Sequence, residues 1–479
     1  MNENYKLEFE LIQQTPMLHF QHGQQGATLR ASEVKPKLDR FLLKKLGGFD
    51  KVWEEHCDWF IGNPAKNDEK ARKSVKEKPA LDYKLRILAN AQPEKSETIE
   101  FDIAVNNAMK TGLKASEAKR AVRSLHNYTG INSMYFGNMV TNNGDYEENV
   151  RDNYKETVFY DKPLTLSIIC FDTELLGNIK NYLSEFFLLN NFGTRQSKGF
   201  GGFLLKGEKE DLSVFDKNEM PYFYFKLPAN TNKEQTMNYA LVVYNVMKSG
   251  INLTGYDKKN GIYKNPDAYL KGFSVREFLP HDTGSDKAFI KSNVLAGKAR
   301  KYGSKEPSNK YDKYVFIRAI LGLADNYDFK DDMRWGKVLI KNYDSLTISS
   351  NSISVNMDDV VNSKGINRFQ SPATIKVFND KVVFFFNNSY EIMQNQPFLL
   401  LKQDELSVLE EYAKRNKSLT AVDIKGIPGL AEVSCITTPS KFDVNSFIHD
   451  FVAYFNSNKG KLKNMPKPHK EASSLNLIE

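Results

Sequence analysis

Apolar residues fall along the chain in short runs that have the period of strands or of helices. Alternation over residues 5–12 predicts a half-buried strand, and a continuous apolar run at 164–170 predicts a buried one. Apolar residues at helical spacing predict a helix over 172–189, and another apolar run begins at Phe203. The first part of the chain therefore alternates strands with single helices.

The same alternation returns in the second half of the chain. The pattern predicts, in order, a strand at 222–225, a helix at 234–248, hairpin strands at 366–378 and 381–386, and a helix at 444–456. Both halves approximate the split β–α–β–β–α–β order. The sequence thus predicts an α+β protein with one coarse duplication.

Domain boundaries follow from these patterns. A chain of 479 residues is long enough for two or three domains of ~150 residues each. We place an N-terminal domain at 1–210, a C-terminal domain at 211–458 and a tail at 459–479. The tail is basic and contains proline, which predicts disorder. Residues 63–78 are almost purely polar and rich in lysine, which predicts either an insertion or a mobile loop.

Composition narrows the class of protein. The net charge of +8 favours a polyanionic partner, and the hydrophobic content of 41% supports folded cores. The three cysteines, Cys57, Cys170 and Cys435, lie far apart, which argues against a disulfide framework and against a thiolate zinc site. Because the N-terminus is polar and no apolar run approaches the ~20 residues of a membrane span, we expect a soluble cytoplasmic protein.

A glycine-rich loop at residues 191–203 is the strongest functional signal. It reads Asn-Phe-Gly-Thr-Arg-Gln-Ser-Lys-Gly-Phe-Gly-Gly-Phe. Because glycine tolerates positive φ and has no Cβ, such a loop can bring backbone N–H groups close to a ligand. With Arg195 and Lys198 beside them, these groups predict a phosphate cradle. The order of elements fits neither a Walker loop nor a dinucleotide fingerprint, and an ordinary surface turn is the alternative.

A second cationic stretch surrounds the start of the first predicted helix. A short strand at 27–30 ends in Arg30 and is followed by Ser32, a residue type that favours the N-cap position. Lys35, Lys37 and Arg40 fall within the helix. A helix N-terminus with cations nearby suits a phosphate group. A solvated helix face is the alternative.

Residues 29–35, the glycine loop at 193–201 and the Arg-Phe-Gln-Ser-Pro segment at 368–372 occur in an order that resembles the RAMP superfamily of CRISPR proteins. The resemblance is strongest to the two-domain RAMP subunit that lies at the crRNA 3′ end of Cmr (type III-B) effector complexes. It covers most of the chain to about residue 390, thinly between the motifs.

The resemblance implies two ferredoxin-like (RRM-like) domains packed together, with insertions and a basic cleft for RNA. It also implies a structural, non-catalytic subunit that binds crRNA and target RNA in antiviral defence, assembles with other Cmr/RAMP subunits and needs no cofactor. The RNA contacts that it implies are Arg30, Ser32, Lys35, Arg40, Gly193, Arg195, Lys198, Gly199, Gly201, Arg318, Arg368 and Ser371. The first helix departs from the family pattern, because Pro36 replaces a glycine and Asp39 an arginine.

Catalytic residues are harder to find. Several RAMP relatives process crRNA with a histidine near the glycine loop, so His19 and His22 are the best candidates. A general acid/base histidine needs a partner within hydrogen-bond reach, and the sequence shows none. Acid pairs at 331–332 and 358–359 have no Gly-Asp-Asp context, so we predict neither catalytic nor metal-binding residues. Two alternatives stay open: a metal-independent endoribonuclease that processes crRNA, and a scaffold that contacts only proteins.

Overall fold

The structure is a computed structural model of the whole chain. Its described residues are 5–18, 29–90, 157–193, 195–252, 269–290, 313–323, 369–402, 434–465 and 469–479, with short pieces at 94–95, 109, 112–114, 117–118, 255–257, 262–264, 326–328, 337–342, 348–349 and 352–353.

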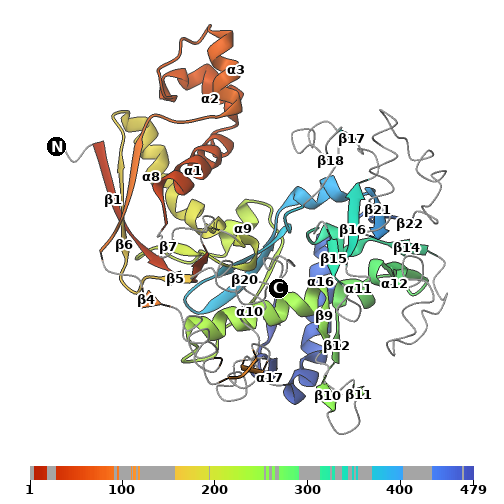
Figure 1. Cartoon of the computed structure of the whole chain (residues 1–479). Coiled ribbons are helices and arrows are strands. Elements are labelled where there is room, and N and C mark those ends of the chain that lie inside the picture. The colour runs from red at the N-terminus through yellow and green to blue at the C-terminus, as the bar shows by residue number, and fades with distance from the viewer. Residues whose placement is uncertain are drawn as a thin grey trace.

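The N-terminal unit is built on an antiparallel sheet with the spatial order β3-β6-β1-β7. Its strands are β1 (Lys6–Gln13), β3 (Lys84–Ala89), β6 (Leu164–Ile169) and β7 (Phe203–Leu205). Two helices, α1 (Ala31–Lys45) and α8 (Thr173–Leu189), pack on one face (Figure 1). Alternate residues of β6 are buried against these helices, because successive side chains of a strand point to opposite faces. The predicted strands and helix of this region are confirmed.

A helical lobe is inserted between α1 and β3 and projects from the sheet (Figure 1). It contains α2 (Phe49–His56), the 3₁₀ helix η2 (Cys57–Trp59) and α3 (Glu69–Glu77). The prediction of a mobile loop at 63–78 is therefore wrong. The Asp68 side chain accepts hydrogen bonds from the N–H groups of Lys70 and Ala71 and caps α3, a local signal that outweighs the high lysine content.

A second antiparallel sheet repeats the same arrangement, in the spatial order β19-β20-β8-β23. Its strands are β8 (Tyr222–Lys226), β19 (Ala373–Val377), β20 (Lys381–Phe386) and β23 (Leu477–Ile478). Helix α10 (Lys233–Lys248) follows β8, and α16 (Val444–Asn458) follows β20. The predicted hairpin between β19 and β20 is confirmed. Both units therefore run strand, helix, two strands, helix, strand.

The second sheet is buried on both faces. Phe384 and Phe386 of β20 pack in the core that contains α10 and α16. Val383 and Phe385 point the other way and pack with Leu188 of α8 and with helix α9 (Ser213–Lys217). This explains why β20 reads as an unbroken apolar run. The two units are consequently joined through a shared hydrophobic layer (Figure 1).

A third, mixed sheet was not predicted. Its strands, in spatial order, are β13 (Thr283–Ser285), β14 (Lys313–Val315), β22 (Ser434–Thr437), β21 (Pro397–Lys402), β16 (Lys337–Asn342) and β15 (Asn326–Asp328). They come from two insertions into the second unit, one between α10 and β19 and one between β20 and α16.

Smaller elements complete the described chain. They are β2 (Met17–Leu18), β4 (Glu94–Lys95), β5 (Thr157–Phe159), η3 (Gln196–Lys198), β9 (Gly250–Asn252), β10 (Gly255–Asp257), β11 (Ile262–Lys264), β12 (Tyr269–Lys271), α11 (Phe273–Arg276), α12 (Asp286–Phe289), α13 (Ile317–Ile320), β17 (Ile348–Ser349), β18 (Ser352–Ile353), η7 (Asn388–Met393), η8 (Lys459–Asn464) and α17 (His469–Ala472).

The start of α1 differs from its prediction. The helix begins at Ala31, with Arg30 at the N-cap position and no side-chain cap, so Ser32 is an exposed residue of the first turn. The segment predicted as a strand ends in irregular backbone at Leu29 and Arg30. The cations Arg30 and Lys37 therefore lie on either side of the first turn of α1. The predicted phosphate site depends on this placement of cations beside a helix N-terminus.

The described residues of the basic C-terminal segment, 459–465 and 469–479, form regular elements, so the prediction of a disordered tail is wrong for them. They form η8, α17 and β23, and β23 completes the second sheet beside β8. Apolar residues spaced among the lysines are buried and anchor the segment: Leu462, Met465, Ala472, Leu475 and Leu477. The first sheet ends with β7 and the second begins with β8, and β23 belongs to the second unit.

Leu477→Ala should destabilise the protein by about 2–4 kcal/mol, because it removes a buried side chain from β23. Urea unfolding followed by circular dichroism measures the change. Lys463→Ala is the matched control, since Lys463 is an exposed residue of the same segment. Equal stabilities for the two variants would contradict the docking of this strand.

Candidate nucleic-acid interface

The glycine loop lies at the junction between the two units, where its glycines are needed for packing. Gly193, Gly199 and Gly201 have φ values of +82°, +86° and +70°. A Cβ on Gly201 would lie 1.9 Å from the carbonyl oxygen of Phe192. A Cβ on Gly199 would approach the Cγ2 of Ile375 in the second sheet to 3.1 Å. Glycine therefore allows a left-handed backbone and a close approach between the units.

The N–H groups of these glycines already have acceptors within the protein. Gly199 donates to the carbonyl of Gln196, and Gly201 donates to that of Pro16 at 2.8 Å. Burial raises the pKa of Glu33 at the start of α1, and a backbone interaction with the N–H of Gly193 partly offsets this rise. The sequence predicts a cradle of open glycine N–H groups at this loop. The structure does not present such a cradle. Phosphate recognition at this loop would depend chiefly on side chains.

A buried lysine fastens the two units together beside the loop. The ammonium of Lys376, on β19, donates to the carbonyls of Asn190 at 2.7 Å and Phe203 at 3.3 Å, and to Oδ1 of Asn191 at 3.2 Å. Asn191 Nδ2 in turn donates to the carbonyl of Ile375 at 2.8 Å. Burial, with a smaller contribution from repulsion by the nearby Lys37, lowers the pKa of Lys376 to about 7.

Helix α1 contributes a second lysine to the same region. Lys37 donates to the carbonyl of Asn191 at 2.8 Å and to the side-chain oxygen of Gln196. Its ammonium also lies 5.2 Å from the ring centroid of Phe192. Burial lowers the pKa of Lys37 to about 8, with a smaller contribution from the exposed Arg40. Lys37 therefore links α1 to the loop, and Arg40 continues the positive face outward.

The tip of the loop faces the second unit. Lys198 lies 5.8 Å from the ring centroid of Tyr244 on α10. Burial lowers its pKa to about 8, and the neighbouring Arg195 adds to this by charge repulsion. Burial also lowers the pKa of Arg195, to about 10, so its guanidinium stays charged at neutral pH. Both side chains are only partly buried, so they can be reached from solvent.

Further cations of the second unit lie next to Lys198. Lys248, at the end of α10, donates to the carbonyls of Leu321 and Gly322. Burial lowers its pKa to about 7, and repulsion from Arg318 and Lys198 contributes. The guanidinium of Arg318 pairs with the buried Asp286, with Nε 2.7 Å from Oδ2. The second unit thus adds two cations and one acid to the junction.

The structure brings together predicted residues from distant parts of the sequence. Ser371 is 7% exposed and lies against Gly322, whose Cβ would be 3.2 Å away. Its hydroxyl also faces Tyr244, which in turn lies under Lys198. The predicted residues Arg195, Lys198, Arg318 and Ser371 therefore converge around α10. Arg368 is outside the described residues.

Lys35 has a different role from the predicted one. Its ammonium donates to Oδ2 of Asp39 at 2.9 Å and to the carbonyl of Leu81 at 2.7 Å, and it lies 4.2 Å from the ring centroid of Tyr83. Asp39 is 2% exposed, so Lys35 neutralises a buried carboxylate. This pair explains the departure from the family pattern at Asp39, and Lys35 points away from the glycine loop.

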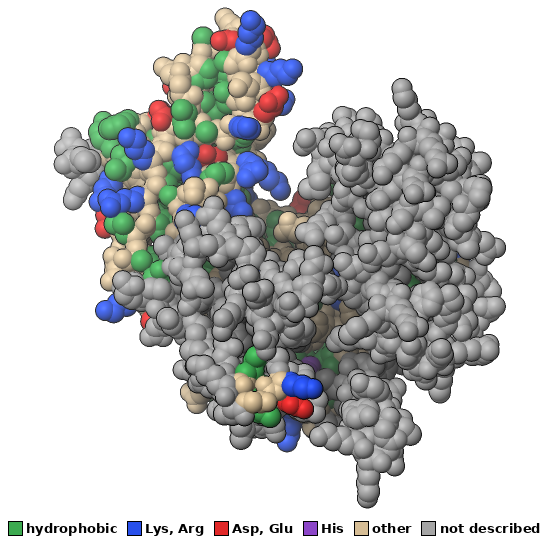
Figure 2. Space-filling view, viewed as in Figure 1, with side chains coloured by type: hydrophobic (Ala, Val, Ile, Leu, Met, Phe, Trp, Pro, Cys, Tyr) green, Lys and Arg blue, Asp and Glu red, His purple; other side chains and the backbone are tan. Residues whose placement is uncertain are grey.

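We define the junction cluster as the cations Lys37, Arg195, Lys198, Lys248, Arg318 and Lys376. Sequence reasoning did not assign Lys248 or Lys376 to the site, and it named Lys37 only among the cations around the start of the first helix. Lys376 is a lone lysine within the apolar strand Ala-Thr-Ile-Lys-Val, and this pattern could have indicated a buried lysine. Figure 2 shows that Lys and Arg side chains also gather on the described surface of the N-terminal unit, several of them beside the hollow between that unit and the rest of the molecule.

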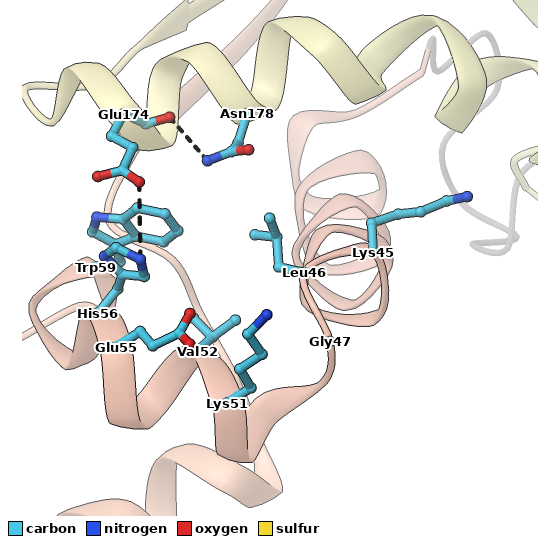
Figure 3. Close-up of a pocket in the computed structure, with 10 residues that line it drawn as sticks. All are labelled: Lys45, Leu46, Gly47, Lys51, Val52, Glu55, His56, Trp59, Glu174 and Asn178. Atoms are coloured by element: carbon cyan, nitrogen blue, oxygen red, sulfur yellow. Dashed lines mark hydrogen bonds and ion pairs between the residues drawn. The ribbon is translucent and has the colours of Figure 1, made fainter.

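A separate pocket of about 370 Å³ lies where α1, α2 and α8 meet (Figure 3). His56 stacks on Trp59 with 3.9 Å between ring centroids, and its Nε2 is 3.9 Å from Oε1 of Glu174. This pocket contains a histidine but none of the junction cluster. His19 and His22 are outside the described residues, and within the described part of the chain no three His, Cys, Asp or Glu residues are grouped to hold a metal ion.

Two family models match the chain and together span most of its length. The family model of the Cmr1 N-terminal domain matches residues 4–251, and that of the Cmr1 C-terminal domain matches residues 269–471. Among solved structures, the apo crystal structure of Cmr1 from Pyrococcus furiosus matches with 10% identity and a TM-score of 0.24, over 53% of this chain and 80% of that one. No curated protein sequence matches. None of the helices that the structure describes has the length and hydrophobicity of a membrane span.

The stability of the protein should rise between pH 7 and pH 9. Lys37, Lys198, Lys248 and Lys376 have folded-state pKa values of about 7 to 8, well below the ordinary value of 10.5. In this range the unfolded chain binds more protons than the folded one, so stability grows with pH and is lost as the pH falls towards the folded-state values. Urea unfolding at pH 7 and pH 9 measures the difference.

Lys198→Met should reduce this rise by about 1 kcal/mol, because one of the shifted groups is gone. Lys180→Met is the control, since Lys180 is an exposed residue of α8. A rise that Lys198→Met leaves unchanged would contradict the burial of this ammonium.

Proposed function

The chain belongs to the Cmr1 family and is a RAMP subunit of the type III-B Cmr complex, and from this we propose that it is a non-catalytic structural subunit that binds RNA across the junction of its two units. Its RNA partner is the 3′ region of crRNA, the target RNA, or both. Its protein partners are other Cmr subunits, and it acts in the cytoplasm in antiviral defence.

The two units are proposed to be the two ferredoxin-like (RRM-like) RAMP domains. The repeated order of strand, helix, two strands, helix and strand supports this, as do the matching spatial orders β3-β6-β1-β7 and β19-β20-β8-β23. The six-stranded sheet is an elaboration of the second domain.

The junction cluster is the observation that carries the proposal. Lys37 and Arg195 come from the first unit, and Lys248 comes from the second. Burial lowers the pKa values of these cations, and repulsion from other cations adds to this for Lys37 and Lys248, so the protein holds them at a cost in free energy. A polyanion would offset that cost, because each phosphate restores a favourable partner to a poorly hydrated cation.

Contacts of this kind predict a particular mode of binding. Lysine and arginine side chains bind phosphates without reading the bases, so affinity falls steeply with salt and depends little on sequence. Phe192 and Phe200 of the loop are fully buried, so neither ring is open for base stacking. The proposed contacts are therefore Arg30, Lys37, Arg40, Arg195 and Lys198, with Ser371 and Arg318 behind them.

A non-catalytic role agrees with the chemistry at the junction. Phosphodiester cleavage without metal needs a general base within about 3 Å of the attacking hydroxyl. Lys248 has a lowered pKa, but it donates to two backbone carbonyls, which hold its amino group against the protein. The endoribonuclease alternative, with His19 or His22, is tested separately below.

Arg195→Ala with Lys198→Ala should weaken binding of single-stranded RNA at least tenfold at 50 mM salt, because two phosphate contacts are lost. The salt dependence, plotted as log K against log salt, should also become shallower by about 1–2 units of slope. Filter binding with the purified chain measures both quantities.

Lys180→Ala is the matched control for this double variant, since it removes an exposed cation of the N-terminal unit away from the junction. If the wild-type chain does not bind RNA, or if the double variant binds as tightly as the control, the proposal fails. Co-purification with partner subunits but no RNA protection would favour the scaffold alternative.

Purified protein incubated with crRNA repeat RNA in EDTA should leave the RNA intact over hours, because the proposed role involves no cleavage. Denaturing gel electrophoresis detects any product. Products that disappear with His19→Ala or His22→Ala would overturn the non-catalytic assignment and favour the endoribonuclease.

A further inference from the structure

Thr15 lies between β1 and β2 and contacts the glycine loop through its side chain. The residue is fully buried. Its hydroxyl donates a hydrogen bond to the carbonyl of Gly199 at 2.6 Å and accepts one from the N–H of Gly202 at 2.8 Å. A hydroxyl can donate and accept at the same time. Thr15 therefore bonds to two residues of the loop that come much later in the sequence.

The backbone beside Thr15 is attached to the same end of the loop. The N–H of Gln14 donates to the carbonyl of Gly202 at 2.8 Å. The hydroxyl of Thr15 extends this attachment to Gly199, which directly follows Lys198 in the sequence. The end of β1 thus fixes the backbone next to one of the two cations at the tip of the loop.

The conformation of the loop makes such contacts necessary. Gly199 and Gly201 have positive φ values, and so does Arg195, with a φ of +56° that is uncommon for a residue with a side chain. Glycine loses more conformational freedom than any other residue when its backbone is fixed. Without attachments the loop would sample many backbone conformations, and the side chains of Arg195 and Lys198 would move with it.

Building on the proposed function, we propose that Thr15 is a positioning residue for RNA binding. Its hydroxyl holds Gly199 and Gly202 in place, so that Arg195 and Lys198 are directed at the RNA strand before the strand arrives. RNA then binds a loop that is already ordered, and the binding free energy is not spent on ordering it. Because Thr15 is fully buried, it acts through the backbone of the loop and does not touch RNA.

Thr15→Val removes the hydroxyl and keeps the branched shape of the side chain. Affinity for a single-stranded RNA of about ten nucleotides should fall roughly three- to tenfold at 50 mM salt, although no charge has been removed. Thr15→Ser keeps a hydroxyl and should restore affinity to within about twofold of the wild type. Filter binding with the full chain measures all three proteins.

A buried threonine elsewhere in the chain controls for loss of stability. Thr438 is 2% exposed, and its hydroxyl accepts from the N–H of Gln396 at 2.7 Å and donates to the carbonyl of Met393. Thr438→Val therefore leaves the same kinds of backbone group unpaired, but away from the glycine loop. Both valine variants should lower the midpoint of urea unfolding, and only Thr15→Val should weaken RNA binding.

A combined variant separates positioning from general damage. If Thr15 acts through Arg195 and Lys198, adding Thr15→Val to Arg195→Ala with Lys198→Ala should weaken binding by no more than about twofold further. If Thr15→Val is unfolded by circular dichroism, Thr15→Cys replaces it, since a thiol of similar size is a weaker donor and acceptor. Its affinity should then fall between those of the wild type and the Arg195→Ala, Lys198→Ala variant.

Each result decides the matter. A loss that Thr15→Ser restores, and that disappears when the two cations are absent, supports the positioning role. Wild-type affinity in the folded Thr15 variant, an equal loss in Thr438→Val, or a full further loss in the combined variant overturns that role and leaves the proposed function standing. Absence of RNA binding by the folded wild-type chain overturns the proposed function and the role of Thr15 with it.

Discussion

The ammonium group of Lys376 is the contact on which the joint between the two units depends. It is fully buried and donates to the carbonyls of Asn190 and Phe203 and to the side chain of Asn191. Taking an ammonium out of water is costly, and the three oxygens offset that cost only when both sheets are in place. The position of β19 relative to α8 and β7 is consequently specified by one polar group within an apolar layer.

This joint determines what the glycine loop can do. The loop runs from Asn191, which bonds to Ile375 across the joint, to Phe203, whose carbonyl accepts from Lys376. Its glycines serve the close packing of the two units, and the side chains of Arg195 and Lys198 remain at its tip. Any ligand held there touches both units at once, which makes the loop a contact point between the sheets as well as a basic surface.

Local patterns in the sequence were enough for the elements with strong periodicity and for the loop. The strand at 164–169, helix α8 and the β19–β20 hairpin were predicted because many apolar residues repeat there at one period. The third sheet was missed because its strands are short and pair over long separations. Lys376 was missed for a similar reason, since the oxygens that hold it come from residues 190–203, far away in the sequence. The many lysines at 459–479 led to a prediction of disorder, but a few buried leucines anchor this segment to the second unit.

The last strand of each sheet comes at a very different position in the sequence. The first sheet is complete at β7, within 205 residues of the start of the sequence, whereas the second begins at β8 and is completed only by β23. During synthesis the first sheet can therefore assemble early. Strand β8, with its four aromatic residues, can pair only after its neighbours β20 and β23 have been synthesised. In that interval β8 has unpaired backbone groups and apolar side chains in water, so the vectorial emergence of the chain makes this strand the point most exposed to misassembly.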